Sequence, residues 1–412
     1  MTADLRELSD RFLRGASTPE EDATLIRGLL RDEASGAALE PSNESNYGAV
    51  LDRIAARVPE LERAVERENE EARQLALLLE SGDRVAAVAA VRAAGKRVAK
   101  VAFEELCQAS QQACARDPER AVRLGEAALA AATALGEPDL EARAEARIAN
   151  AHRVRGDFPA SAERIVRARE RLGDGLGSPV ARGDVALRDA ALLADQSRFA
   201  EALRRSREAG RWFTNAGAGT ESLRALLQQS NILRELDRLP EALAVLERAA
   251  EAPDIAGEPR LQFAVATNRA CYQAELGRFA AAEAGLSAAR GLAASLGNPL
   301  DAPRVDWVEA VLRGEQGRLG EAENLLRRVR SRYLELDLAH DVALATLELA
   351  LVVARQGRYA EAHRLALEAL PTFEALRVSP EAVAALRLAV GSAREEALRV
   401  EVLRSALKRL RR

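Results

Sequence analysis

The segment Gly357-Arg-Tyr-Ala-Glu-Ala362 is one of six copies of a short pattern that recurs along this chain. Each copy begins with a turn-forming residue, carries a bulky apolar residue at its third position and ends in a small residue at its sixth. The other copies are Gly156-Asp-Phe-Pro-Ala-Ser161, Ser197-Arg-Phe-Ala-Glu-Ala202, Asp237-Arg-Leu-Pro-Glu-Ala242, Gly277-Arg-Phe-Ala-Ala-Ala282 and Gly317-Arg-Leu-Gly-Glu-Ala322. In chain order, their first residues are separated by 41, 40, 40, 40 and 40 positions, and a weaker copy, Arg116-Asp-Pro-Glu-Arg-Ala121, lies 40 positions before the first. Such regular spacing indicates an internal structural repeat.

The residue types of the pattern predict a turn between two helices in every copy. Glycine ends a helix well because it can adopt the left-handed conformation of a C-terminal cap. Asp237 and Ser197 are less suited to that conformation, although aspartate is enriched there among the other residues. We expect the bulky residue to fill the angle between the paired helices and the small residue to let them approach closely. A second small or modest residue follows seven positions later on the same helix face, at Ala168, Ala209, Ala249, Ala289, Val329 and Ala369.

The composition fits packed helices and excludes several other classes of protein. Of the 412 residues, 48% are apolar but only 3% are aromatic, so helix contacts must be built mainly from Ala, Leu and Val. Charged residues make up 30% and the net charge is −4, so nothing in the charge demands a nucleic acid as partner. The N-terminus lacks the apolar core of a signal peptide, and no apolar stretch approaches the roughly 20 residues that span a bilayer. The three cysteines, Cys107, Cys114 and Cys271, form no disulfide framework, so a reducing, cytoplasmic setting is expected.

The turn pattern, with its small residue seven positions later, resembles the tetratricopeptide repeat (TPR) over residues 100–395. The familiar repeat has about 34 residues, whereas the interval here is 40. Repeats of this longer kind resemble those of bacterial peptide-sensing regulators and cargo-binding adaptors. The resemblance implies an all-α fold, a right-handed TPR-like α-solenoid of about seven helix-turn-helix repeats with an N-terminal helical region.

The pattern divides the chain into five expected parts. These are an N-terminal helical hairpin (1–34), a linker rich in Ser, Asn, Gly and Pro (35–46), a long helix and a short helix (47–95), the TPR solenoid (96–395) and a C-terminal capping helix (396–412). The pair Phe12-Leu13-Arg14-Gly15 and Pro19-Glu20-Glu21 also resembles the helical half of anti-sigma-factor zinc-binding modules. That module takes its zinc ligands from a histidine and a Cys-x-x-Cys, and neither is present before Cys107, so no metal is expected.

The chain shows no motif typical of catalysis or of cofactor binding. None of the three histidines, His152, His340 and His363, forms part of a His-Glu-x-x-His motif, and no nucleophile motif is present. Gly95-Lys96 is followed by Arg97 and therefore lacks the Ser or Thr of a P-loop. The basic run 404–412 has two interpretations: a helix end that complements its own dipole, which we favour, or a tail for nucleic acid or an acidic partner. We therefore predict no enzyme activity, no catalytic residues, no cofactor and no metal.

Polar residues on the first helix of each repeat are the candidate ligand contacts, because these helices line the inner surface of a curved stack. Counting back from each turn places carboxamides and arginines at matched positions, and a carboxamide can both donate to and accept from a peptide backbone. The alternative is that these are ordinary solvated positions. The candidate residues are Asn150, Arg153, Gln228, Asn231, Arg234 and Asn268.

Three functions fit a chain that binds rather than catalyses. The first is a protein- or peptide-binding scaffold, adaptor or sensor that regulates a partner protein. The second is a regulator that sequesters a transcription factor, as the anti-sigma resemblance implies. The third is a non-catalytic subunit that regulates a neighbouring enzyme such as a protease or nuclease. A membrane partner is not expected, nucleic acid is disfavoured, and the terminal helices are the candidates for self-association into a homo-oligomer.

Overall fold

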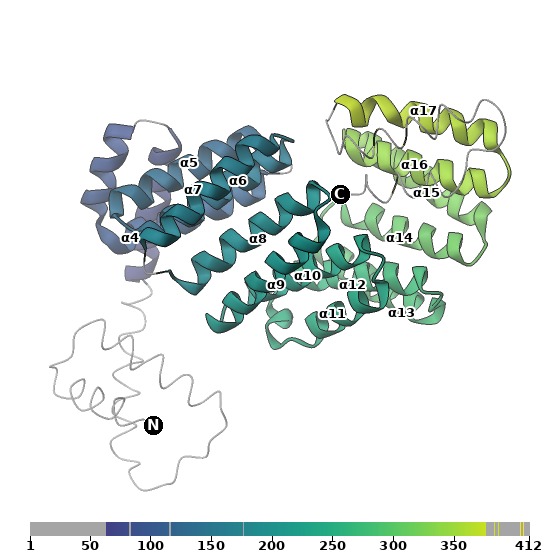
Figure 1. Ribbon diagram of the computed structural model, residues 1–412, viewed down its shortest axis with the longest axis horizontal. Coiled ribbons are helices and arrows are strands. Elements are labelled where there is room, and N and C mark those ends of the chain that lie inside the picture. The colour runs from purple at the N-terminus through teal and green to yellow at the C-terminus, as the bar shows by residue number, and fades with distance from the viewer. Residues whose placement is uncertain are drawn as a thin grey trace, which may run out of the picture.

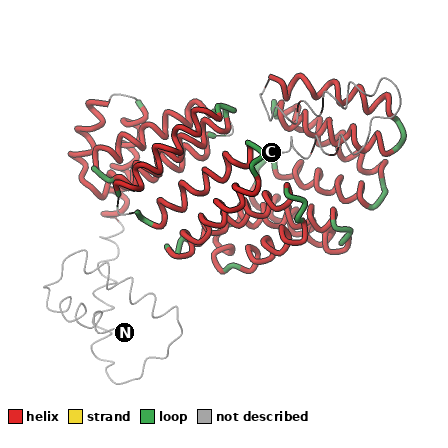
Figure 2. Tube along the Cα trace, in the orientation of Figure 1, coloured by secondary structure: helices red, strands yellow, loops and turns green. Residues whose placement is uncertain are grey.

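The computed structural model describes residues 63–81, 84–114, 117–175 and 177–375, together with the isolated residues Val383, Leu386, Arg404 and Leu407. Within these residues the chain is helical and has no β-strand (Figure 2). The expected hairpin at 1–34, the linker at 35–46 and the boundary between 395 and 396 lie outside the described residues. No helix in the described ranges is both long enough and apolar enough to cross a membrane.

Seven consecutive helix pairs make up most of the described chain, and they follow one another in a curved row (Figure 1). A helix over 63–80 precedes them, and a short 3-10 helix, η1 (Pro253–Gly257), separates the fourth pair from the fifth. The pairs are α4 (Arg84–Ala113) with α5 (Pro118–Leu135), α6 (Pro138–Val154) with α7 (Phe158–Asp174), α8 (Pro179–Asp195) with α9 (Phe199–Asn215), α10 (Gly219–Glu235) with α11 (Leu239–Glu251), α12 (Pro259–Glu275) with α13 (Phe279–Leu296), α14 (Asp301–Glu315) with α15 (Leu319–Glu335), and α16 (Ala339–Arg355) with α17 (Tyr359–Ala375). The predicted all-α solenoid is confirmed.

The turn of each repeat has the backbone that the sequence pattern predicted. Its first residue has a positive φ in all six copies, and the non-glycine residues Ser197 (φ 62°) and Asp237 (φ 60°) adopt it as well. The following backbone N–H closes the helix end, as when Asp157 donates to the His152 carbonyl at 2.9 Å and Arg238 donates to the Leu233 carbonyl at 2.9 Å. These bonds satisfy the last carbonyl groups of the first helix, which would otherwise lack partners.

The small positions are the most deeply buried part of the repeat. Ala202, Ala242, Ala282, Ala322 and Ala362 are 0% exposed, and so are four of the six residues that follow seven positions later. The bulky third residue behaves less uniformly: Phe199 is partly buried against Leu193 and Leu203, whereas Tyr359 is 44% exposed and does not fill the helix angle as expected. Close helix approach therefore depends on the small residues more than on the bulky one.

The first helices of neighbouring pairs lie closer together than the second helices do. Contacts join α4 with α6, α6 with α8, α8 with α10, α10 with α12, and α12 with α14, while the second helices of neighbouring pairs are not joined to the same extent. A stack that is tighter on one side must curve toward that side. The even-numbered helices from α4 to α16 therefore form the concave surface.

Residues 47–95 are described only from 63 onward, apart from 82 and 83. The helix over 63–80 packs Ala72, Leu75 and Leu79 against α4. Gly95 interrupts α4 with a non-helical backbone (φ 80°, ψ 163°), which coincides with the expected boundary between 95 and 96. That domain boundary stays a prediction, because both halves of α4 share one core cluster.

We predict that Gly183→Ala lowers the thermal midpoint of unfolding while Gly291→Ala raises it. Both glycines lie inside helices, where alanine is intrinsically better by about 0.5–1 kcal/mol. A Cβ at position 183 would lie 2.6 Å from the ring of buried Phe213, whereas one at position 291 would meet nothing within 4 Å. Overpacking of this kind costs about 1–3 kcal/mol. Thermal unfolding followed by circular dichroism measures the midpoint of each variant. Equal shifts of the two midpoints would contradict the tight α8–α9 contact.

Candidate functional site

Two rows of side chains run along the concave surface, nine and six positions before each turn. Residues three apart on a helix share a face, so both rows point the same way. The row at nine positions is Arg147, Arg188, Gln228, Asn268, Val308 and Glu348, and the row at six positions is Asn150, Ala191, Asn231, Cys271, Val311 and Leu351. We call these the concave rows. They are mainly polar from α6 to α12 and mainly apolar on α14 and α16.

Four predicted residues lie on α10 and α12, and two of them, Asn231 and Asn268, bond to each other. The Asn268 amide donates to Asn231 Oδ1 at 3.1 Å, and the Tyr272 hydroxyl donates to the same oxygen at 3.0 Å. Gln228 donates to the Leu187 carbonyl on α8 at 3.2 Å, which leaves its buried Oε1 without a partner. Because Asn231 is exposed and Asn268 is half-buried, Asn231 Nδ2 and Asn268 Oδ1, which these bonds do not use, can still reach a ligand.

Arg234 is held by the next repeat and is not free to meet a ligand as a bare cation. Its guanidinium forms a bidentate ion pair with Glu275 and lies 5.7 Å from the Tyr272 ring centroid. Burial opposes the charged form of Arg234, and Glu275 more than offsets this, so the pKa of Arg234 stays above its ordinary value. The Arg234–Glu275 pair therefore joins α10 to α12.

Asn150 and Arg153 lie apart from the other four, on α6. The Asn150 amide donates to Cys114 Sγ at 3.3 Å, and its oxygen accepts from Arg153 at 3.1 and 3.2 Å. Arg153 also pairs with Asp195 of α8 at 2.6 Å. Both side chains are thus engaged with neighbouring first helices.

The first-helix residues between these two groups were missed by the sequence analysis. Buried Asp184 of α8 accepts from Arg143 at 3.2 Å and from Arg147 at 3.2 and 3.3 Å, and Arg143 also pairs with Glu104 at 2.5 and 2.8 Å. Burial raises the pKa of Asp184, but Arg147 and Arg143 outweigh it, so that pKa lies below its ordinary value. Counting nine positions back from each turn would have found Arg147 and Arg188, because Gln228 and Asn268 occupy the same row.

The apolar end of the concave surface is covered by the chain itself. Leu407, 2% exposed, shares a core cluster with Ala310, Leu351 and Val352, and Arg404 lies 3.9 Å from Glu315. A cavity of about 240 Å³ separates these residues from Arg234 and Glu275. Leu407 and Arg404 therefore cover the apolar part of the concave rows, on α14 and α16.

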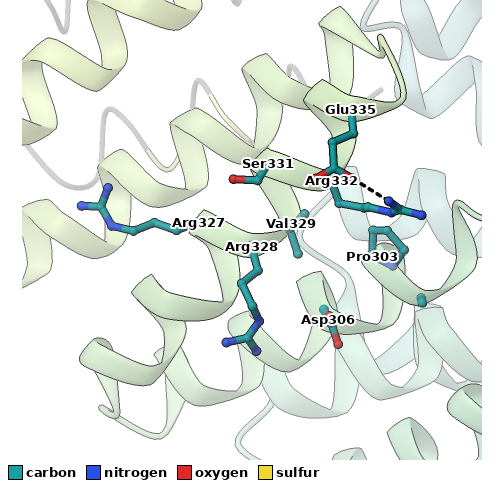
Figure 3. A pocket seen from close by; sticks show the side chains of 9 residues that line it. Pro303, Asp306, Arg327, Arg328, Val329, Ser331, Arg332 and Glu335 are labelled. Carbon is teal, nitrogen blue, oxygen red and sulfur yellow. Dashed lines mark hydrogen bonds and ion pairs between the residues drawn. The ribbon is translucent and has the colours of Figure 1, made fainter.

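A second hollow, of about 580 Å³, lies between α14 and α15 (Figure 3). Two of its three arginines already pair with carboxylates: Arg327 with Glu323 and Glu361, and Arg332 with Glu335, which also lines the hollow, at 2.5 Å. Burial raises the pKa of Asp306 in this hollow. No set of side chains converges there, so the concave rows are the better candidate site.

The described residues offer no group of three or more His, Cys, Asp or Glu side chains arranged to hold a metal ion. None of the three cysteines forms a disulfide, and burial raises the pKa of Cys107 to about 11 and also raises that of Cys114. Thiols with raised pKa values are poor nucleophiles at neutral pH because little thiolate is present.

No protein-family model and no curated protein matches this chain. Several solved structures share its fold. A Rap protein complexed with competence and sporulation factor has a TM-score of 0.57 at 12% identity, covering 74% of this chain and 85% of that one. Aspartyl phosphate phosphatase F from Bacillus subtilis has a TM-score of 0.54 at 10% identity, covering 92% and 95%. The Rap conjugation gene regulator of plasmid pLS20, in complex with the Phr* peptide, has a TM-score of 0.55 at 15% identity, covering 68% and 76%.

These similarities establish the TPR-like repeat fold and no more, because the identities are low. The resemblance of residues 12–21 to anti-sigma modules gains no support from them. That segment lies outside the described residues.

We predict that Asp184→Asn destabilises the protein by about 3–5 kcal/mol at pH 7, because it leaves Arg147 buried without a carboxylate. Because the folded-state pKa of Asp184 is depressed, its contribution is complete above the unfolded pKa of about 3.9 and is lost as the pH falls further. The stability gap between wild type and variant should therefore narrow below about pH 4.

The matched control is Glu201→Gln, which breaks the exposed Arg198–Glu201 pair. It should change stability by no more than about 1 kcal/mol. Denaturant unfolding between pH 3 and pH 7 measures both variants. If Asp184→Asn lowered the free energy of unfolding no more than the control does, the buried Arg147–Asp184 pair would not stabilise the fold.

Proposed function

We propose that this chain is a regulatory binding protein that holds an extended peptide segment across the polar part of its concave surface. The observation that carries the proposal is the pairing of carboxamides on adjacent first helices, Asn231 on α10 with Asn268 on α12. A carboxamide presents a donor and an acceptor together, as a peptide backbone does, so such a row can bind backbone without selecting sequence.

The dimensions of the groove suggest the length of the ligand. Packed helices lie about 8–10 Å apart, so the four first helices from α6 to α12 span about 24–30 Å. An extended chain rises about 3.3 Å per residue, which corresponds to a segment of about eight residues. A longer segment would meet the apolar end, where Leu386 and Leu407 already pack.

Some of the similar structures are complexes with a bound factor or peptide, which supports this proposal by analogy of fold. Two of them are named as complexes, one with competence and sporulation factor and one with a peptide. For this chain the peptide or protein partner, a cytoplasmic location, and self-association through terminal helices are predictions. One similar structure is named a phosphatase, so the absence of enzyme activity also stays a prediction.

We predict that a random octapeptide library incubated with the immobilised full chain yields retained peptides, which mass spectrometry can sequence. Replacing Asn231 and Asn268 together by Ala should weaken the affinity for a retained peptide by about tenfold, since each hydrogen bond contributes about 0.5–1.5 kcal/mol. Fluorescence anisotropy measures the Kd.

The matched control is Asn324→Ala, which changes an exposed asparagine on the second helix α15 and should leave the Kd unchanged. The proposed groove fails if the Asn231/Asn268 variant binds the peptide as tightly as wild type does. It also fails if no octapeptide is retained at all.

A further inference from the structure

Arg188 of α8 is a half-buried cation that has no bonded carboxylate among the described residues. Its one hydrogen bond to a side chain joins Nη2 to Gln111 Oε1 of α4 at 3.4 Å, and that oxygen also accepts from Arg147 at 2.7 Å. Its Nε is buried and has no partner. Arginine is normally buried only with an anion or a complete set of acceptors, because removing the charge from water is costly.

The surroundings of Arg188 make its charge harder to sustain. Burial and the neighbouring Arg147 lower the pKa of Arg188 to about 9, and Asp184 offsets only part of this effect. Asp184 is already bonded to Arg143 and Arg147. A negatively charged group of a ligand would favour the charged form of Arg188 and raise its pKa toward the ordinary value.

Two further unsatisfied atoms lie in the same row on either side of Arg188. Arg147, 8% exposed, has a buried Nε without a partner on α6. Gln228 has a buried Oε1 without a partner on α10, and its amide bonds the carbonyl of Leu187, the residue before Arg188. Unsatisfied buried polar atoms are uncommon in native proteins. Three of the four among the described residues lie at matched positions of adjacent repeats, and Arg269 Nε is the fourth. A polar ligand could bond all three.

The charges around Arg188 indicate what net charge a bound ligand group should carry. Arg188 and the charges linked to it are four guanidinium groups and three carboxylates, which leaves one positive charge among them. The groups are Arg143, Arg147, Arg153 and Arg188, with Glu104, Asp184 and Asp195. A single carboxylate would neutralise this remainder, whereas a phosphate with nearly two negative charges would exceed it.

We propose that Arg188, together with Arg147, binds a carboxylate of the peptide ligand, and that Gln228 Oε1 accepts an N–H of the ligand beside it. A planar guanidinium suits a carboxylate because it can donate two parallel hydrogen bonds. The assignment rests on the proposed function, since it places the acidic group of the peptide at the α6–α8 end of the groove. The carboxylate can come from the C-terminus of the peptide or from an Asp or Glu side chain.

The first experiment needs no peptide. N-acetylglycine carries a carboxylate like that of a peptide C-terminus, and N-acetylglycinamide is the same molecule without the charge. Titrated into the full chain at about 10 mM, a concentration suited to weak single-contact binding, the acid should shift the Nε–H NMR signals of Arg188 and Arg147. The amide should not, and the shift should disappear in Arg188→Met. Equal effects of acid and amide, or no effect of the acid, would overturn the assignment.

The stability of Arg188→Met separates a ligand site from a structural residue. Without ligand, loss of an unpaired buried cation should raise the melting temperature by about 2–4 °C, whereas loss of a structural ion pair would lower it. The matched control is Arg211→Met, at an exposed position on the second helix α9, which should change neither the melting temperature nor the NMR response. A lower melting temperature for Arg188→Met would contradict the unpaired state.

The second experiment identifies the source of the carboxylate. The octapeptide library is presented with free C-terminal carboxylates and, separately, with C-terminal amides. Preference for the acid form assigns the site to the C-terminus, and enrichment of Asp or Glu in both forms assigns it to a side chain. Either preference should fall at least about tenfold in Arg188→Met, as expected for loss of a charge-assisted hydrogen bond.

The two experiments fail in distinguishable ways. Retention of peptides without preference for any carboxylate would overturn the Arg188 assignment and leave the binding function standing. An N-acetylglycine response without retention of any octapeptide would keep the carboxylate site and remove the peptide-binding function.

Discussion

The whole structure depends on the close approach of paired helices at the small residue of each turn segment. A fully buried Ala at this position removes the side-chain bulk that would separate the two helices, and the same role recurs seven residues later. Each pair is too small to bury its own apolar surface and must pack on its neighbours. One local constraint, repeated every 40 residues, therefore produces both the core and the curvature.

The curvature in turn decides what polar residues can do. Because first helices are drawn together, a side chain on one of them meets its counterpart about 40 residues away, as in the Arg143–Asp184, Arg234–Glu275 and Arg260–Asp301 pairs. The carboxylates of these pairs are largely shielded from water, so each needs a cationic partner. Arg188 differs from these arginines because it bonds no carboxylate among the described residues and its buried Nε has no partner. A buried charge that destabilises the unliganded protein is a common feature of sites that bind ligands.

The sequence predicted the fold closely and the candidate site only in part. The turn residues, the small positions and the helix pairs follow from local chemistry, and even the non-glycine turns at Ser197 and Asp237 could be recognised from their spacing. The contacts of the candidate site were harder to predict, because the partner of each side chain lies about 40 residues away, in the next repeat. Asn231 and Asn268 do meet, whereas Asn150 and Arg153 are used to join α6 to its neighbours. The position of Leu407 depends on which apolar face the repeats leave uncovered, and local pattern does not determine that.

The most direct test of this account is backbone amide hydrogen exchange on the full chain, with and without a bound octapeptide. Exchange reports local opening, which a ligand suppresses where it binds. A peptide held in the concave rows predicts slower exchange in α6, α8, α10 and α12, with little change in the second helices α7, α9, α11 and α13. Protection concentrated in the second helices, or confined to α14 and α16, would contradict it.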